Sequence, residues 1–228
     1  MKHGVLGTEY AAGRNNSKAL KYRLGRRTSE VKKSIETFFG LHPEFIIDLG
    51  TAEGKMLSEI NNSFPKAKCI RVEYNPDLVK LGRKLFPTLE IYEGDVQDLS
   101  SYSLSKGFDV AIATAVIEHV DNPEKFIFEV NKILKVNGIL IITAPDPFWE
   151  NIATKVGHFK DGQHNEVPNL QRLTKRVTNA GMDVLKAEKF MLSPVGMPAE
   201  ISIERFFRKL GLSFMMANQL LVAKKSKA

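Results

Sequence analysis

The sequence predicts an α/β fold with a doubly wound, mostly parallel sheet of seven strands. From Phe45 onward, short runs rich in Ile, Val and Phe alternate with segments of helical periodicity. Most of these runs do not alternate polar and apolar residues, which is typical of strands that helices cover on both faces. No helix is predicted after the last run. We therefore expect that run to enter the sheet as an antiparallel last strand, with helices preceding the sheet at the N-terminus.

Seven strands and five intervening helices follow from this pattern. The predicted strands are 45–49, 68–73, 89–94, 108–114, 138–144, 183–190 and 214–223. The predicted helices are 53–64, 76–86, 122–135, 170–181 and 199–210. The helix at 122–135 has the clearest start, because Asn122 can cap it and Pro123 suits its first turn. Asn137-Gly138 then turns the chain into the next strand.

The N-terminal part divides the chain into two predicted units. Residues 28–39 place Val31, Ile35 and Phe38 on one helical face, whereas residues 1–16 are polar and are expected to be mobile without ligand. We predict that residues 1–40 form an arm and helix that act as a lid or substrate cap. Residues 41–228 would form the catalytic domain.

The composition limits the class of protein. The chain has 228 residues and a net charge of +7, and residues 1–40 hold nine Lys/Arg against three Asp/Glu. This basic arm either binds an anion or is a solvated helix face. The single cysteine, Cys69, excludes an intrachain disulfide and is expected to be a buried packing residue. No apolar run approaches the ~20 residues of a membrane span, so a cytoplasmic protein is expected.

Polar and glycine residues follow the first four strands at the points where these strands end. Ligands of doubly wound sheets bind outside the carboxyl ends of the strands, where the strand order reverses. Gly50 and Gly54 would let the backbone approach a ligand closely, and Glu73 lies 23 residues after Gly50, where an acidic residue can accept ribose hydroxyls. The residues at these strand ends are Asp48, Gly50, Gly54, Glu73, Asp95, Thr114, Glu118 and His119.

A dinucleotide site is the first alternative, and the turn argues against it. Such a site wants G-x-G-x-x-G, whereas this turn has Ala52 in the middle and Lys55 where the third glycine would stand. Asp48 at the mouth also suits a cationic group better than a pyrophosphate.

The motifs together resemble those of the class I S-adenosylmethionine-dependent methyltransferases, over about residues 44–223. The first motif is "IIDLGTAEG", followed by "VEYNP", "EGDVQDL" and the block "FDVAIATAVIEHVDNPEKFIFEVNKILKVNGILIITAPD". The resemblance is nearest to the small-molecule branch of ubiquinone and menaquinone biosynthesis methyltransferases. It implies a Rossmann-like methyltransferase fold that binds S-adenosyl-L-methionine. The implied cofactor residues are Asp48, Gly50, Thr51, Gly54, Glu73, Tyr74, Asp95, Val96 and Thr114.

The chain departs from the family pattern at two positions. Ala52 replaces the usual middle glycine, which is tolerated if its φ is negative. "LKVNG" replaces the more frequent Lys-Pro-Gly-Gly turn and affects a connection, not the site.

Methyl transfer from a sulfonium needs positioning and exclusion of water, and a base only for a weakly acidic acceptor. His119 is the candidate base, with packing or helix capping as its alternative role. We expect no metal site, because His158 and His164 lack suitable partners.

The predicted function is methyl transfer to a small-molecule acceptor of aromatic or anionic character. The acceptor would contact three segments: the arm with Tyr10 and Tyr22, residues 145–168, and residues 193–213. A nucleic-acid methyltransferase is disfavoured, because the body at 41–223 is slightly acidic. A non-catalytic protein that binds S-adenosylmethionine is the remaining alternative.

Overall fold

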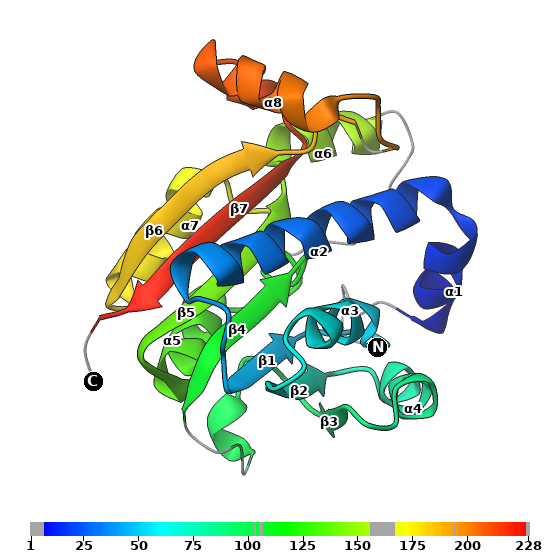
Figure 1. Ribbon diagram of the computed structural model, residues 1–228, viewed down its shortest axis with the longest axis vertical. Helices are drawn as coiled ribbons and strands as arrows, with labels where there is room; N and C mark the ends of the chain where they lie inside the picture. Colours follow the sequence, from blue (N-terminus) through cyan, green and yellow to red (C-terminus); the bar gives the residue numbers. More distant parts are fainter. Residues whose placement is uncertain (1–6, 103, 105–106, 156–166, 194, 227–228) are drawn as a thin grey trace.

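The computed structural model describes residues 7–102, 104, 107–155, 167–193 and 195–226. These residues form one seven-stranded sheet flanked by helices (Figure 1). The strands are β1 Phe45–Leu49, β2 Lys68–Glu73, β3 Glu90–Glu93, β4 Phe108–Thr114, β5 Leu134–Pro145, β6 Met182–Phe190 and β7 Asn218–Lys225. The helices are α1 Thr8–Asn16, α2 Lys18–Phe38, α3 Lys55–Ser63, α4 Pro76–Leu85, α5 Pro123–Ile133, α6 Pro147–Lys155, α7 Leu170–Asn179 and α8 Glu200–Lys209, with 3₁₀ turns η1 Leu99–Ser101 and η2 Ser213–Met215.

The predicted topology of the sheet is confirmed. The strand order is β3-β2-β1-β4-β5-β7-β6. Strands β1 to β5 pair in parallel, whereas β7 is antiparallel to both of its neighbours, β5 and β6. The order reverses between β1 and β4, so ligands are expected outside the carboxyl ends of these two strands.

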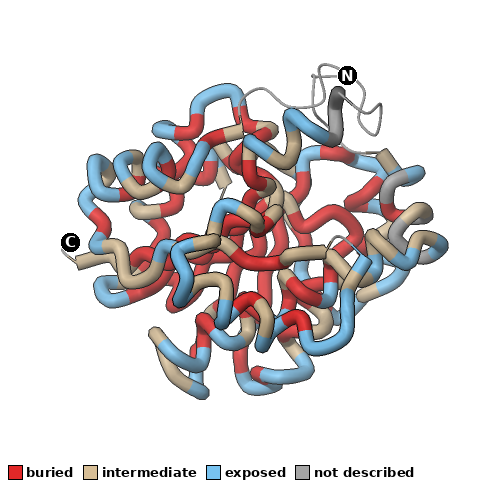
Figure 2. The backbone as a smooth tube through the Cα atoms, turned by 90° about the horizontal axis from the view of Figure 1, so that it is seen from above, coloured by how far each residue is buried: buried red, intermediate tan, exposed pale blue. Residues whose placement is uncertain are grey.

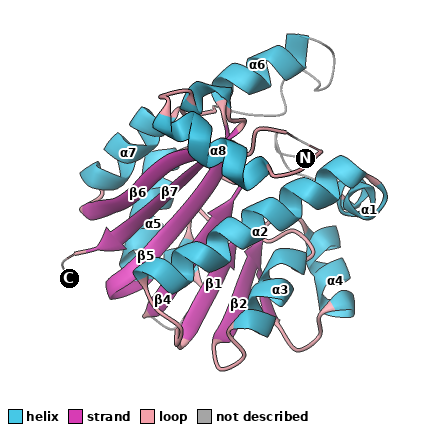
Figure 3. Ribbon diagram, turned by 45° about the horizontal axis from the view of Figure 1, so that its top comes forward, coloured by secondary structure: helices cyan, strands magenta, loops and turns pink. Residues whose placement is uncertain are grey.

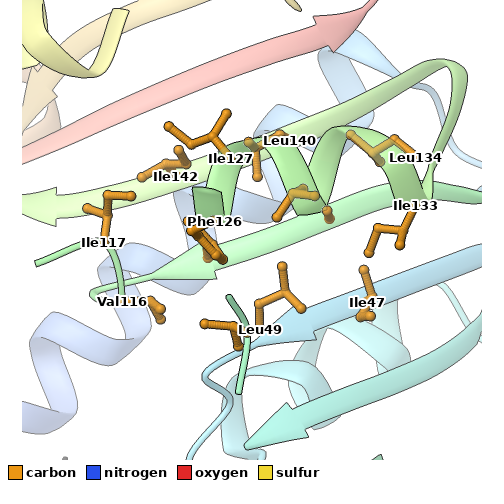
Figure 4. Close-up of a cluster of buried hydrophobic side chains, with 14 of the residues drawn as sticks. Ile47, Leu49, Val116, Ile117, Phe126, Ile127, Ile133, Leu134, Leu140 and Ile142 are labelled. Carbon is orange, nitrogen blue, oxygen red and sulfur yellow. The ribbon is translucent and has the colours of Figure 1, made fainter. Parts of the chain in front are cut away.

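Helices cover the sheet on both faces, which explains the continuous apolar strands. On one face, α5 packs on side chains such as Ile47, Leu140 and Ile142 (Figure 4), and α7 lies beside it against β6 and β7. On the other face, α2 and α3 pack on side chains such as Ile46 and Ile112. Seen from above, the buried residues are concentrated in the strands and on the inner sides of the helices (Figure 2).

The N-terminal helices differ from the prediction. α2 begins at Lys18, ten residues before the predicted start at 28, and α1 was not predicted. Ser17 starts α2, because its side chain accepts a hydrogen bond from the Leu20 N–H at 3.3 Å. The buried face of α2 carries polar residues, Arg26 and Thr28 in its first half and Glu30 after them, which hide the apolar periodicity in the sequence.

Two strand boundaries also differ. β5 begins at Leu134, because the predicted Asn137-Gly138 turn is a bulge within the strand: Phe108 pairs with Leu134, and Val110 with Ile139. The preceding helix therefore ends at Ile133 and not at 135. β7 begins at Asn218, four residues after the predicted start at 214, because η2 occupies Ser213–Met215.

The segment 145–168, which the sequence indicated to be a long loop, contains helix α6 at Pro147–Lys155. His158, Phe159 and His164 of this segment lie outside the described residues.

Candidate functional site

The turn after β1 requires glycine at both ends. Gly50 and Gly54 adopt left-handed φ angles of 70° and 94°. A Cβ on Gly50 would lie 2.6 Å from a methyl carbon of Val116, and one on Gly54 would lie 2.3 Å from an Arg71 guanidinium nitrogen. Both the backbone conformation and the lack of space therefore exclude a side chain at these two positions. Helix α3 begins directly after the turn.

The condition under which Ala52 would replace glycine without strain is not met. Its φ is +51°, in the left-handed region and not at a negative value. This conformation costs roughly 1–2 kcal/mol for a non-glycine residue. The Ala52 N–H donates to the Glu73 carboxylate at 2.7 Å, and a hydrogen bond to a charged group contributes about 1.5–3 kcal/mol, which offsets that cost.

Asp48 and Glu73 are both buried, and both accept hydrogen bonds from the turn after β1. The Thr51 hydroxyl donates to Asp48 Oδ2 at 2.7 Å. Glu73 accepts from the Ala52 N–H with one oxygen and from the Asn75 N–H with the other, at 2.9 Å. Each carboxylate oxygen can accept more than one hydrogen bond. Tyr74, directly after Glu73, is 41% exposed at the rim.

Asp95 lies beside Glu73, at the end of the neighbouring strand. The Gly94 N–H donates to the Glu73 carbonyl at 2.8 Å, which joins the two strand ends. Asp95 Oδ1 accepts from the Gln97 N–H at 2.9 Å, and the Asp95 N–H donates to the Tyr102 hydroxyl at 2.7 Å. A Cβ on Gly94 would lie 2.1 Å from that hydroxyl, so Gly94 is sterically required.

The end of β4 meets the start of α3. The Thr114 hydroxyl lies 3.4 Å from the Met56 sulfur, on the helix that follows the glycine turn. His119 is half-buried in the turn between β4 and α5, where its backbone N–H donates to the Val116 carbonyl at 2.8 Å. Val96, which directly follows Asp95, is buried. The structure thus brings the predicted residues of four strand ends to one edge of the sheet.

Arg71 is a residue of this site that the sequence analysis missed. It lies on β2 and is fully buried beneath the glycine turn. Its guanidinium donates to the carbonyls of Glu53 and Phe86, both at 3.1 Å, and to that of Leu89. It thereby ties the turn to the end of α4. A single arginine within the apolar run "KCIRVE" was the available sign of such a role.

Burial shifts the pKa of two residues on β2. It lowers the pKa of Arg71, against the opposing effect of the Asp48 carboxylate. It raises the pKa of the Cys69 thiol to about 12, and the negative charge of Asp48 adds to this shift. Cys69 is therefore a protonated, buried packing residue at neutral pH, as its position in the sequence indicated.

The described parts of the segments predicted to contact an acceptor lie at the same edge of the sheet. The Tyr22 hydroxyl of α2 donates to Glu200 at the start of α8, and Glu200 also accepts from the Ser193 N–H at 2.9 Å. The Trp149 indole N–H of α6 donates to the Phe214 carbonyl at 3.0 Å. The side chain of Tyr10 is outside the described residues.

Two of the basic residues of the arm have structural partners. Arg26 donates to both carboxylate oxygens of Glu204 on α8, at 3.0 and 2.9 Å. Arg27 donates to the Asn218 side-chain oxygen at the start of β7, at 2.8 and 3.1 Å. These two arginines hold α2 against α8 and β7. Part of the positive charge of the arm therefore bonds to partners within the protein.

Among the residues that the structure describes, no group of three or more His, Cys, Asp or Glu side chains could hold a metal ion. None of the described helices is long and apolar enough to cross a membrane.

Comparison with known proteins identifies relatives. Residues 22–187 match the model of a family described as a methyltransferase domain. Malonyl-(acyl-carrier protein) O-methyltransferase of Halalkalibacterium halodurans is 25% identical over 187 residues, which cover 78% of this chain and 69% of that protein. Trans-aconitate 2-methyltransferase of Deinococcus radiodurans is 24% identical over 101 residues, which cover 44% of this chain and 37% of that protein.

The fold has solved counterparts. The crystal structure of a SAM-dependent methyltransferase from Archaeoglobus fulgidus aligns with a TM-score of 0.67 and 19% identity, over 96% of this chain and 100% of that one. At this identity the likeness shows the fold, which agrees with the predicted fold class.

Proposed function

The chain belongs to the methyltransferase domain family, and from that premise we propose which residues bind its cofactor and which kind of acceptor it methylates. It is an S-adenosylmethionine-dependent methyltransferase of the small-molecule type. The cofactor supplies a methyl group on a positively charged sulfur, which is ready for in-line displacement.

The proposed cofactor residues lie along the edge of the sheet, and each group of them would bind a different part of the cofactor. Asp48 and the turn would hold the methionine part, Glu73 and Tyr74 the ribose, and Asp95 with Val96 the adenine. The complete set is Asp48, Gly50, Thr51, Gly54, Glu73, Tyr74, Asp95, Val96 and Thr114. What supports this is the chemistry of the donor set: buried carboxylates lie at neighbouring strand ends, beside a turn that a Cβ would block. Carboxylates suit an ammonium, ribose hydroxyls and an adenine amino group.

For the acceptor, we propose a carboxylate oxygen of a small organic acid. The names of two relatives support this class, because malonyl and aconitate groups both carry carboxylates. A carboxylate oxygen would form the new C–O bond with its own lone pair as the C–S bond breaks and its electron pair returns to sulfur. The products are a methyl ester and the uncharged thioether. No proton is transferred, because such an acid is already ionised at neutral pH.

The role of His119 also tests the proposed carboxylate acceptor. As a general base it would serve only an acceptor that must lose a proton, and its titration would then appear in the pH profile. With a carboxylate acceptor, kcat/KM should stay flat between about pH 6 and 8, and His119→Gln should retain activity. A profile that rises through the histidine range and is lost in His119→Gln would favour a phenol or enol acceptor.

Helix α1, in the N-terminal part of the arm, is proposed to cover the cofactor. What supports this is the position of α1: Ala11 packs on Ala52 of the glycine turn and on Leu78 of α4. Closure there would exclude water from the sulfonium, as lids do in other enzymes.

The acceptor proposal is tested by screening small carboxylic acids with methyl-labelled S-adenosylmethionine. A methyl ester releases its label as volatile methanol when the product is treated with alkali. Alkali-labile label would support the proposal, and label that stays on the product would contradict it. Incorporation into RNA at low salt would favour the nucleic-acid alternative instead.

A further inference from the structure

Helix α8 turns its acidic side toward the body of the protein. Glu204 is fully buried and accepts hydrogen bonds from Arg26 and, at 2.8 Å, from the Met191 N–H. Glu200 is also buried, where it bonds to the Tyr22 hydroxyl. These are the two acidic residues of α8, so its exposed side carries no carboxylate.

The outward face of α8 is apolar and basic. Phe206 and Leu210 are 58% and 56% exposed. The outward face comprises Ile201, Ser202, Arg205, Phe206 and Lys209 of α8 and the C-cap residue Leu210. A surface helix normally buries its apolar side and exposes its charged side, so α8 is inverted in this respect.

Further exposed apolar side chains lie near this helix. Phe214 of η2 is 56% exposed and adjoins α8 in the fold, and the Trp149 bond to its carbonyl connects η2 to α6. Eight of the thirteen large apolar side chains that are exposed among the described residues belong to α6, residues 195–197, α8 with its C-cap residue Leu210, and η2. Such a concentration indicates an interaction surface and not a random scatter.

We propose that the outward face of α8, together with Phe214, binds the surface of a bilayer that contains anionic lipid. Exposed aromatic and aliphatic side chains beside Arg and Lys are the features of helices that lie in a lipid interface. α8 lies at one end of the molecule, at the top of Figure 1 and next to α6 (Figure 3), a position that a fluid surface can reach without a matching groove.

A second copy of the chain fits this face less well. In a symmetric dimer the same patch meets itself. Arg205 and Lys209 would then face their own copies with no carboxylate on the face to balance them. Anionic lipid provides that balance, at about 1 kcal/mol or roughly fivefold in binding for each cation.

The face also has a defined relation to the candidate site. β6 runs parallel to β5, since both are antiparallel to β7. The chain from Met191 to Ala217, which contains α8, therefore lies at the carboxyl edge of the sheet, where the glycine turn also lies. Binding through α8 would place this edge toward the lipid.

Vesicle co-sedimentation of the full chain tests the proposal. Wild type should sediment with vesicles of phosphatidylcholine and phosphatidylglycerol at low salt, and much less with phosphatidylcholine alone. Arg205→Gln/Lys209→Gln should weaken binding about thirtyfold, and Phe206→Ser/Leu210→Ser should weaken it by at least tenfold. Helix α4 offers matched exposed controls, Arg83→Gln/Lys84→Gln and Leu85→Ser, which should bind like wild type.

Four outcomes of these experiments would overturn the proposal. Wild type could fail to bind the anionic vesicles, or the α4 controls could lose as much binding as the α8 variants. Retention on polyglutamate without vesicle binding would point to an acidic protein, and a dimer that Phe206→Ser/Leu210→Ser dissolves would point to self-association. Titration of S-adenosylhomocysteine into each variant keeps the cofactor site separate, because the α8 variants should retain wild-type affinity.

Discussion

Replacing Arg71 with methionine should weaken the fold and the cofactor site together. The guanidinium of Arg71 donates to the carbonyls of Glu53, Phe86 and Leu89 and lies 3.5 Å from that of Gly82. Each hydrogen bond from a charged donor contributes about 1.5–3 kcal/mol. Removing a buried cation also relieves a desolvation cost of several kcal/mol, so the loss is smaller than the sum.

We therefore expect Arg71→Met to lower the free energy of unfolding by about 3 kcal/mol, which corresponds to a Tm lower by roughly 6–12 °C in a chain of this size. The carbonyl of Glu53 belongs to the glycine turn, so the loosened turn must be ordered again when ligand binds. The affinity for S-adenosylhomocysteine should fall about five- to tenfold, equal to ~1–1.4 kcal/mol.

Thermal melts and calorimetric titration measure both effects. Arg26→Met is the matched control, because Arg26 is also a buried arginine, but its partner Glu204 lies on α8, away from the turn. It should lower the Tm and leave the affinity for S-adenosylhomocysteine unchanged. An Arg71→Met variant with wild-type affinity, or with a Tm within about 2 °C of wild type, would refute the reasoning about Arg71.

Three further predictions concern Glu73, Glu200 and the arm. Glu73→Ala should lower the free energy of unfolding by about 2–4 kcal/mol, because two backbone N–H groups lose their acceptor. Glu73→Gln should keep most of the stability. Denaturant melts of the two variants measure the difference. Burial raises the pKa of Glu200 above 4.5, so its contribution to stability is present below that pH and is lost as the pH rises through the folded-state pKa. Glu200→Gln should flatten that part of the Tm-against-pH curve, and an unchanged curve would exclude this cause. Deleting residues 1–16 removes the contact of Ala11 with Ala52. It should reduce kcat/KM for the acceptor more than it reduces the affinity for cofactor, which steady-state rates and calorimetric titration would show. Turnover equal to that of wild type would mean that these residues do not act as a lid.

The sheet and the position of the site could be predicted from local sequence. Strands covered on both faces form continuous apolar runs, and parallel strands bring their carboxyl ends to one edge. The residues that terminate these runs, from Asp48 to Thr114, therefore meet at that edge whatever the details of the loops.

Features that depend on distant partners could not be predicted. The left-handed Ala52 is held by Glu73, which lies 21 residues away in the chain. Arg26 is charged and yet buried, because Glu204 lies 178 residues further along the chain. Local periodicity contains no information on either pairing, so the start of α2 was predicted wrongly and the left-handed φ of Ala52 could not be foreseen.

Titration of S-adenosylhomocysteine into three site variants and one control tests the central claim most directly. The variants are Asp48→Asn, Glu73→Gln and Asp95→Asn, and the control is Glu93→Gln, an exposed carboxylate close to Asp95 in the chain. We predict micromolar affinity for wild type and control, no comparable binding of NAD, and an affinity about ten- to a hundredfold weaker in the site variants. Wild-type affinity in all three folded variants would show that the cofactor binds elsewhere.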